Sequence, residues 1–453
     1  MTTTAHLDPQ RPVSRRRVSL GRVVAASVVT GASVALTLVL GVFPGAVEST
    51  VTGSLMVGFG LGWAMLAVLS VRYTDQSQRW AAVPAAALSV TGLALLAGSP
   101  GDATLATVGW VWPPVLLALS VWMVGRVRRD VRGRSRWLLL PIVAVLGVSA
   151  VGAGYEDLGL RHDQERFAAP GTTYDVHGRR LHLDCHGTGS PTVVLESGPG
   201  EFSATWSRIT AQVAPTTRVC AFDRAGQGWS EDAPGLPQDG VAAARDLHAL
   251  LAQAGEQGPF VLVGHSIGGP YALIYADRYP DQIAGVVLLD SSSPQQLTAI
   301  PSFAGEYAVT RRGVALLPTL ARIGLPRLLG GLIGSHLPEP AAGPVQAFAG
   351  SPRGLRNMRD EQSILPELFR QAQALTTLGD RPLAVVTASE NLSTDGWQAA
   401  QDRLAELSTN CVQSVSESTH AGLLEDEHGA GDSVAAIQDV VAAVRTGTPL
   451  DPR

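Results

Sequence analysis

The first third of the chain consists of long apolar segments separated by short polar ones. Each segment is close to the roughly 20 residues that an α-helix needs to cross a bilayer. The pattern predicts five membrane helices, over residues 18–43, 53–71, 81–98, 105–125 and 137–155. A cleaved signal peptide explains the first segment less well, because its apolar run is too long for a signal core and further spans follow.

From about residue 156 the apolar positions fall into short β-rich runs, with Gly, Pro and helical stretches between them. This alternation predicts one α/β domain over residues 156–453. Residues 291–378 are too long for a loop in a compact domain, so we expect a helical cap there. The predicted strands are residues 173–176, 180–185, 192–196, 217–222, 260–263, 284–289, 383–387 and 412–415.

The basic residues, all of them arginine, are unevenly distributed among the segments that connect the predicted helices. Arginines are concentrated in the tail of residues 1–17 and in the second and fourth loops, whereas the first loop carries only Glu48 and the third only Asp102. Positively charged loops remain on the cytoplasmic side. We therefore expect a multi-pass protein of the plasma membrane, in contact with lipid, with a cytoplasmic tail and an extracytoplasmic α/β domain.

Net charge and cysteine content narrow the possible partners. The formal net charge of −5 is mild, and gives no reason to expect a nucleic acid. Cys185, Cys220 and Cys411 are widely spaced and odd in number, which specifies neither a disulfide framework nor a zinc site. We expect no metal and no cofactor. Three buried small apolar side chains are the favoured interpretation, and one disulfide is the alternative.

A G-x-S-x-G motif follows the predicted strand at residues 260–263. It comprises residues 264–268, and an Ala-rich helical pattern follows it. A strand, a sharp turn and a helix in this order lift the serine hydroxyl clear of the sheet. We therefore expect Ser266 to be a nucleophile and the Ile267 N–H, at the start of the helix, to be an oxyanion donor.

Several motifs together resemble the α/β-hydrolase superfamily, in particular its esterase, perhydrolase and epoxide-hydrolase-like branch. The resemblance covers about three fifths of the chain, residues 172–445, and implies a mostly parallel sheet of eight strands under a helical cap. The membrane segments are not part of it. The motifs occur in the expected order, at residues 195–200 followed by Trp206, and then at 222–230, 264–268, 287–292 and 418–422.

The resemblance also implies that nucleophile, acid and histidine follow one another along the chain. His420 stands just after the last predicted strand and is the expected base, whereas His428 fits a surface residue better. Asp290 ends the sixth predicted strand and is the preferred acid. Glu390 and Asp395, which follow the seventh strand, are the alternatives.

A second oxyanion donor is expected from the loop at residues 197–200. Superfamily members place the donor at the position that Pro199 occupies here, and proline has no N–H. Gly198 and Gly200 are therefore the candidates.

These features favour a membrane-anchored serine hydrolase that cleaves a small hydrophobic ester, or an amide or lipid-like relative of one, through an acyl-enzyme. An epoxide or haloalkane hydrolase is disfavoured, because those enzymes use an aspartate nucleophile where this chain has Ser266. The alternative is a non-catalytic ligand-binding or sensor membrane protein that uses a hydrolase fold.

Overall fold

The computed structural model describes residues 18–234, 237–333 and 336–451. The tail of residues 1–17, predicted to be cytoplasmic, lies outside the described residues. The chain forms two compact units that divide after Gly154, one residue before the predicted boundary. The two units are described separately.

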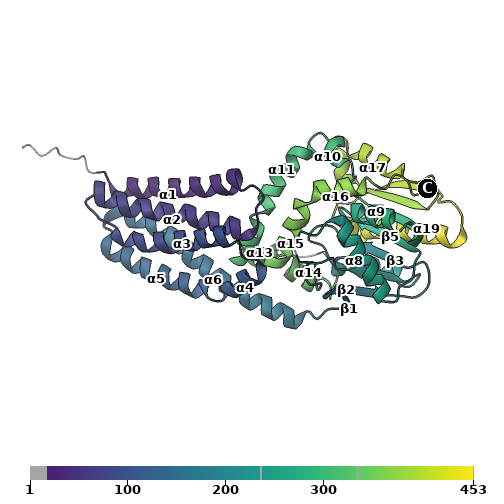
Figure 1. The fold of residues 1–453 in the computed structure, drawn as a ribbon, viewed down its shortest axis with the longest axis horizontal. Coiled ribbons are helices and arrows are strands. Elements are labelled where there is room, and N and C mark those ends of the chain that lie inside the picture. Colours follow the sequence, from purple (N-terminus) through teal and green to yellow (C-terminus); the bar gives the residue numbers. More distant parts are fainter. Residues whose placement is uncertain (1–17, 235–236, 334–335, 452–453) are drawn as a thin grey trace, which may run out of the picture. The chain divides into compact units, whose positions relative to one another are not determined.

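The first unit is helical (Figure 1). Among the described residues, four helices are long and apolar enough to cross a membrane, or five if a pair bent by 47° counts as one span. The prediction of about five apolar helices is thereby confirmed. The helices are α1 (Leu20–Leu36, continued by a π-helix, Thr37–Val42), α2 (Glu48–Tyr73), α3 (Ala82–Gly98), α4 (Asp102–Gly109), α5 (Trp112–Asp130) and α6 (Arg136–Arg166).

The fourth predicted span differs in shape from the expectation of one helix over residues 105–125. It consists of the bent pair α4 and α5, with the break next to Pro113 and Pro114. Proline has no N–H, so it fits the first turn of a helix without loss of a hydrogen bond. Pro113 and Pro114 occupy this position in α5, which begins at Trp112.

Glycines allow the first three helices to pack closely. A Cβ atom on Gly58 of α2 would lie 2.7 Å from the Cβ of Ala35 in α1, and one on Gly53 of α2 would lie 2.8 Å from the carbonyl oxygen of Gly92 in α3. Small residues at these positions let the helix backbones approach each other closely.

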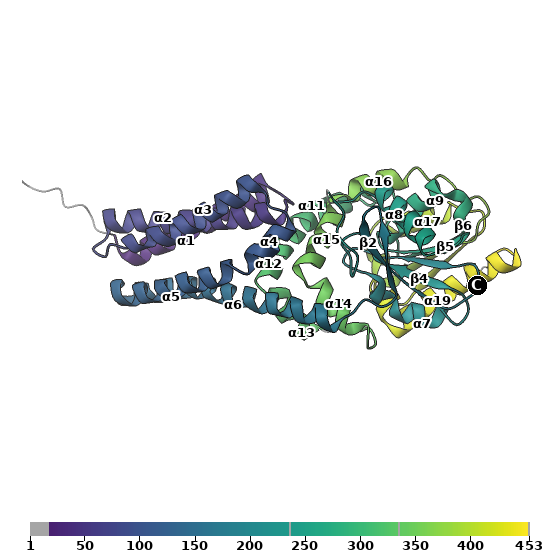
Figure 2. The same cartoon turned by 60° about the horizontal axis from the view of Figure 1, so that its bottom comes forward.

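The second unit is built on one eight-stranded sheet in the order β1-β2-β4-β3-β5-β6-β7-β8 (Figures 1 and 2). β2 pairs antiparallel with β1 and β4, and all other pairs are parallel. All eight predicted strands are present, with ends within two residues of the prediction. The strands are β1 (Thr172–Val176), β2 (Arg179–His186), β3 (Val193–Glu196), β4 (Val219–Phe222), β5 (Phe260–His265), β6 (Ile283–Leu289), β7 (Leu383–Ala388) and β8 (Cys411–Ser416).

Helices cover both faces of the sheet, and the central strands are apolar on both. In β5, Phe260 and Leu262 join one core while Val261 and Val263 join the other, because successive side chains of a strand point to opposite faces. The first core includes α8 (Gly240–Gln253) and α9 (Gly268–Arg278), and the second includes α7 (Ser207–Val213) and α19 (Glu427–Thr446). Short helices α17 (Trp397–Ala405) and α18 (Gly422–Glu425) follow β7 and β8.

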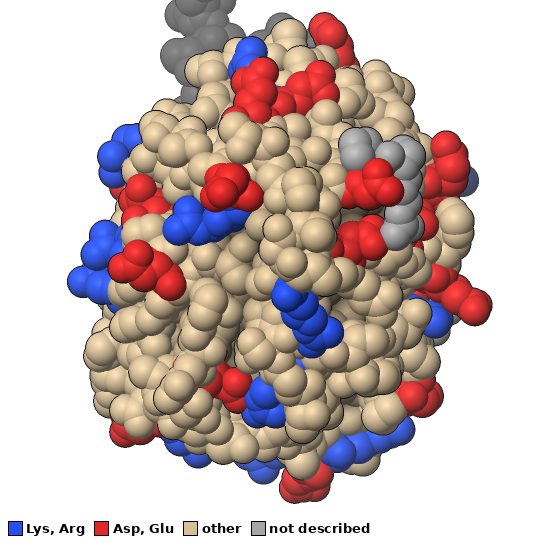
Figure 3. Space-filling view, turned by 90° about the vertical axis from the view of Figure 1, so that its right-hand side faces the viewer, with Lys and Arg blue, Asp and Glu red and all other residues tan. Residues whose placement is uncertain are grey.

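The segment predicted to form a cap is helical throughout most of its described length. It contains α10 (Gln296–Ala299), α11 (Phe303–Val314), α12 (Leu317–Arg322), α13 (Leu325–Ile333), α14 (Ala342–Ala349), α15 (Pro352–Ser363) and α16 (Leu365–Ala372). The face of the second unit drawn in Figure 3 carries interspersed acidic and basic side chains without a broad field of one sign.

One disulfide joins Cys185 of β2 to Cys220 of β4, while Cys411 is free. The favoured interpretation of three unpaired apolar cysteines was therefore wrong for two of them. The two residues are direct partners in the antiparallel register. Sequence spacing does not show which residues of two strands stand opposite each other.

Candidate active site

Ser266 lies in the sharp turn between β5 and α9. Its φ angle is 56°, in the left-handed region that costs energy for a residue with a Cβ. Its N–H donates to the Leu289 carbonyl over 3.2 Å, and its carbonyl accepts from the Ser292 N–H over 3.0 Å. These bonds to the end of β6 and to the segment after it hold the strained turn.

The glycines on either side of Ser266 are required by close packing. A Cβ atom on Gly264 would lie 2.6 Å from the Cα of Gly269, and one on Gly268 would lie 2.1 Å from the carbonyl oxygen of Glu196. Both distances are shorter than van der Waals contact. The motif therefore forms the strand-turn-helix element that its pattern predicts.

Asp290 is fully buried at the end of β6 and accepts hydrogen bonds from four groups. Its oxygens lie 2.6 Å from His420 Nδ1, 2.5 Å from Asn391 Nδ2, 3.1 Å from Trp397 Nε1 and 3.2 Å from the Ala388 nitrogen. An ionised carboxylate only accepts, so Nδ1 of His420 carries the proton. Nε2 is then the basic nitrogen of the neutral ring.

The two alternative acids lie elsewhere. Glu390 accepts from the backbone N–H of His420 over 2.8 Å and does not bond its ring. Asp395 is exposed, in the turn before α17. His428 is also exposed, near Asp432 on α19. Of the carboxylates named from the sequence, the structure brings only Asp290 to the imidazole.

His265 places the His420 loop next to the turn that carries Ser266. The two imidazole rings have centroids 4.5 Å apart, and His265 Nε2–H donates to the His420 carbonyl over 3.0 Å. His265 directly precedes Ser266 in the chain. The base and the nucleophile are therefore supplied by elements in direct contact.

Glu201, which the sequence analysis did not identify, accompanies His265. Its Oε1 lies 2.8 Å from His265 Nδ1. Burial alone would lower the pKa of His265, but the Glu201 carboxylate and the His420 carbonyl outweigh it, so the pKa is raised. Burial would likewise raise the pKa of Glu201, but His265 and the Gly198 N–H lower it overall. Both shifts favour the charged forms of Glu201 and His265, which lie side by side behind His420.

Of the two candidate donors in the predicted oxyanion loop, Gly198 is already engaged in a hydrogen bond. The Gly198 N–H donates to Glu201 Oε2 over 2.5 Å, which removes it from the role predicted for it. Among the described residues, the N–H groups of Ile267 and Gly200 donate to no other group. These two amides are the remaining candidates for stabilising a developing negative charge.

A buried arginine connects this loop to the cap. Arg224 donates to the carbonyl of Ser197 over 2.7 Å, and forms ion pairs with Glu361 of α15 at 2.8 Å and with Glu196 at 3.3 Å. Its guanidinium lies 4.2 Å from the centre of the Tyr271 ring. Burial raises the pKa of Glu196 to about 7, although Arg224 opposes the rise. This cluster fixes α15 over the loop.

Aromatic side chains form an apolar wall beside the loop. Phe202 packs with Phe348 of α14 at 5.8 Å and with Trp229 at 5.4 Å between ring centroids. Trp229 and Phe348 are 5.4 Å apart. Phe202 is separated from the oxyanion loop only by Glu201, so this aromatic wall adjoins the loop in the chain.

One cluster of possible metal ligands among the described residues consists of Cys185, Cys220 and Glu256. Both sulfurs are consumed by the disulfide, and metal binding by cysteine requires thiolates. These residues do not fit a metal ion.

Comparison with known proteins identifies the fold. A family model for the alpha/beta hydrolase fold matches residues 191–322, which include the Ser266 turn. A crystal structure of an α/β-hydrolase protein from Nostoc sp. PCC 7120 matches with a TM-score of 0.51 and 18% identity, over 59% of this chain and 96% of that one. The second unit therefore has the α/β-hydrolase fold.

Two curated relatives are similar over part of their length. An uncharacterized protein of Schizosaccharomyces pombe is 27% identical over 297 residues, which cover 58% of this chain and 54% of that protein. Lipase LipV of Mycobacterium tuberculosis is 40% identical over 111 residues, which cover 24% of this chain and 41% of the lipase. The chain thus spans about half the length of these relatives.

Proposed function

We propose that the chain is a membrane-anchored serine hydrolase that cleaves a hydrophobic ester through an acyl-enzyme. The observation that carries the proposal is the bond from the buried Asp290 carboxylate to Nδ1 of His420, next to the strained turn of Ser266. A nucleophile, a base and an orienting carboxylate are the three parts of a serine-hydrolase triad.

The proposed reaction begins when Nε2 of His420 takes the proton of the Ser266 hydroxyl, whose oxygen attacks the ester carbonyl carbon. The negative charge that forms on the carbonyl oxygen is stabilised by the N–H groups of Ile267 and Gly200. Collapse breaks the bond to the alcohol, which leaves with the proton from His420. Water, activated by the same histidine, then hydrolyses the acyl-enzyme and releases the acid.

The proposed substrate class rests on the aromatic residues that adjoin the oxyanion loop and on one relative. The wall formed by Phe202, Trp229 and Phe348 favours an apolar acyl or alcohol group. The similarity to a lipase over residues that are a quarter of the chain supports an ester rather than an amide bond.

We also propose that the hydrolase unit lies outside the cytoplasm, anchored in the plasma membrane by the apolar helices. Two independent observations support this location. Arginine is concentrated in alternate loops, and Cys185 is joined to Cys220. Disulfides form and persist in oxidising compartments and are rare in the cytosol.

Reaction with a fluorophosphonate probe tests the proposed nucleophile, because only an activated serine is phosphonylated at an appreciable rate. We expect the full chain to be labelled at Ser266, as mapped by peptide mass spectrometry. The Ser266→Ala variant should not react, whereas Ser393→Ala, which changes an exposed serine, should react like the parent. A folded protein that resists labelling would contradict the proposal and favour the ligand-binding alternative.

A further inference from the structure

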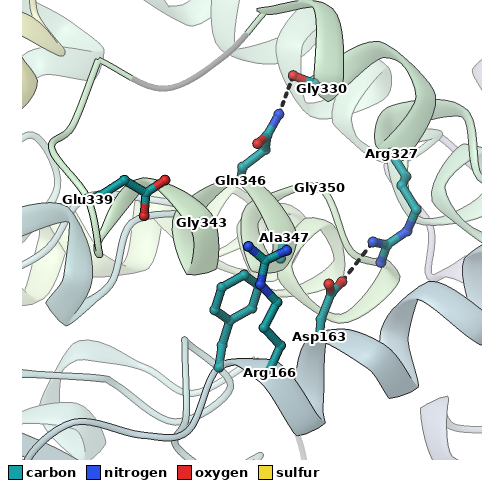
Figure 4. A pocket seen from close by; sticks show the side chains of 10 residues that line it. Asp163, Arg166, Arg327, Gly330, Glu339, Gly343, Gln346, Ala347 and Gly350 are labelled. Atoms are coloured by element: carbon teal, nitrogen blue, oxygen red, sulfur yellow. Dashed lines mark hydrogen bonds and ion pairs between the residues drawn. The ribbon is translucent and has the colours of Figure 1, made fainter.

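Cap helix α13 is attached to the part of α6 that follows the apolar segment. Arg327 forms ion pairs with Glu156 and Asp163, each at 2.7 Å. Figure 4 shows the pair with Asp163 on the wall of a cavity of about 240 Å³. A Cβ atom on Gly159 would lie 2.6 Å from the Arg327 guanidinium carbon. Glu156, Gly159 and Asp163 share one face of α6, so Arg327 lies flat on that face.

The side of α13 away from Arg327 is apolar and exposed. Leu325, Leu328 and Leu329 are spaced as i, i+3 and i+4, which places them on one face of the helix, and they are 38%, 56% and 47% exposed. On α6, Leu158 is 64% exposed. These four leucines are half of the eight large apolar side chains that are exposed among the described residues of the second unit.

The distance along α6 between the end of its apolar segment and the contact with α13 follows from helix geometry. An α-helix rises 1.5 Å per residue, so Gly159 lies about 6 Å beyond Tyr155, where the apolar segment of α6 ends. The hydrocarbon core of a bilayer is about 30 Å thick and the whole bilayer about 40–45 Å, which leaves a headgroup layer of about 5–7 Å on each side. The contact of Arg327 with α6 is therefore as far from the apolar segment as the headgroup layer is thick.

We propose that α13 and the adjacent turn of α6 form a lipid-contacting surface around α6, in which Leu325, Leu328 and Leu329 on α13 and Leu158 on another side of α6 lie at the boundary between headgroups and acyl chains. The inference rests on the proposed membrane crossing of α6. An amphipathic helix with leucines on one side and arginine on the other is the kind of element that lies at this boundary. The surface holds the cap at the lipid boundary, from which a hydrophobic ester reaches the site beneath it.

The test uses the full chain with Cys411→Ser, the native disulfide retained, and one added cysteine carrying an environment-sensitive fluorophore. The test position is Leu328→Cys, with Leu325→Cys as a second variant should the first fold poorly. Leu392→Cys is the matched control, since Leu392 is 39% exposed outside the cap. Val145→Cys reports the membrane crossing, because Val145 lies in the apolar part of α6 and is 64% exposed.

Each labelled variant is reconstituted in phosphatidylcholine vesicles with and without brominated lipid, which quenches fluorophores in contact with acyl chains. We expect at least about a twofold loss of fluorescence at positions 328 and 145, and little change at 392. Quenching at 145 with a response at 328 and 325 no larger than at 392 would overturn the lipid contact and leave the crossing intact. An unquenched label at 145 would overturn the crossing and the lipid contact together.

Discussion

At the scale of single residues, Asp290 combines a proposed catalytic role with a structural one. Its carboxylate binds the His420 ring, as a catalytic acid should, and also accepts from Ala388, Asn391 and Trp397, as a structural carboxylate does. Its φ angle of 40° lies in the left-handed region, which Asp and Asn tolerate better than other residues with a Cβ. Substitution of Asp290 should therefore affect both rate and stability.

We expect Asp290→Asn to lower kcat at least about a hundredfold, because the loss of an orienting carboxylate costs roughly 10⁴ in the trypsin-like case. The melting temperature should fall as well, since the new amide NH₂ faces donors and leaves a buried group unpaired, at a cost of about 1–3 kcal/mol. Ester turnover and thermal unfolding of the purified chain measure the two effects.

Glu390→Gln and Asp395→Asn are the matched controls, singly and together. Neither side chain bonds the His420 ring, so both should retain most of the rate. A dead double variant, combined with an Asp290→Asn protein that is merely less stable, would assign the acid to the segment after β7 instead.

The site residues that could be identified from the sequence lie in short local motifs, whereas those that were missed act through contacts with residues far away in the chain. Ser266 and His420 lie in short motifs that directly follow predicted strands, so a few neighbouring residues are enough to recognise each of them. Glu201 acts through His265, 64 positions further along the chain, and Glu361 meets Arg224 across a separation of 137 residues. No local pattern indicates such pairs, although the position of Glu201 next to the predicted oxyanion loop was a signal that could have been weighed.

At the scale of elements, the strands were predictable because most of them are short, continuous apolar runs between turn residues. A central parallel strand is buried on both faces and has to be apolar throughout, as in β5. The fourth apolar segment was harder to predict, because its apolar pattern runs across Pro113 and Pro114 without interruption. The disulfide depends on the register between β2 and β4. These strands are not joined by a short turn, so the sequence does not show which of their residues stand opposite each other.

A buried ion pair positions one helix of the cap. Helix α15 contributes Glu361 to the buried Arg224 cluster. Removal of one partner from a buried ion pair costs several kcal/mol, about 3–5 in measured cases, because the other charge remains unpaired. Arg224 therefore fixes where α15 of the cap lies relative to the oxyanion loop.

At the scale of the whole molecule, the proposed topology determines in which compartment the α/β unit would act. If the α/β unit lies outside the cytoplasm, an alkaline phosphatase fusion after Arg166 should be active, because that enzyme requires disulfides that form outside the cytosol. A fusion after Asp75, in the arginine-bearing second loop, should be inactive. Activity of the Asp75 fusion together with a silent Arg166 fusion would reverse the topology.

The central claim is that Ser266 performs ester hydrolysis, and turnover of p-nitrophenyl esters of increasing acyl length by the purified full chain tests it most directly. We predict measurable hydrolysis with a preference for longer, apolar acyl groups. We also predict a loss of at least about 10³ in kcat in Ser266→Ala, because removal of a catalytic serine abolishes the acyl-enzyme route. The melting temperature of this variant should match that of the parent. A Ser266→Ala protein that hydrolyses the same esters at the parent rate would contradict the account.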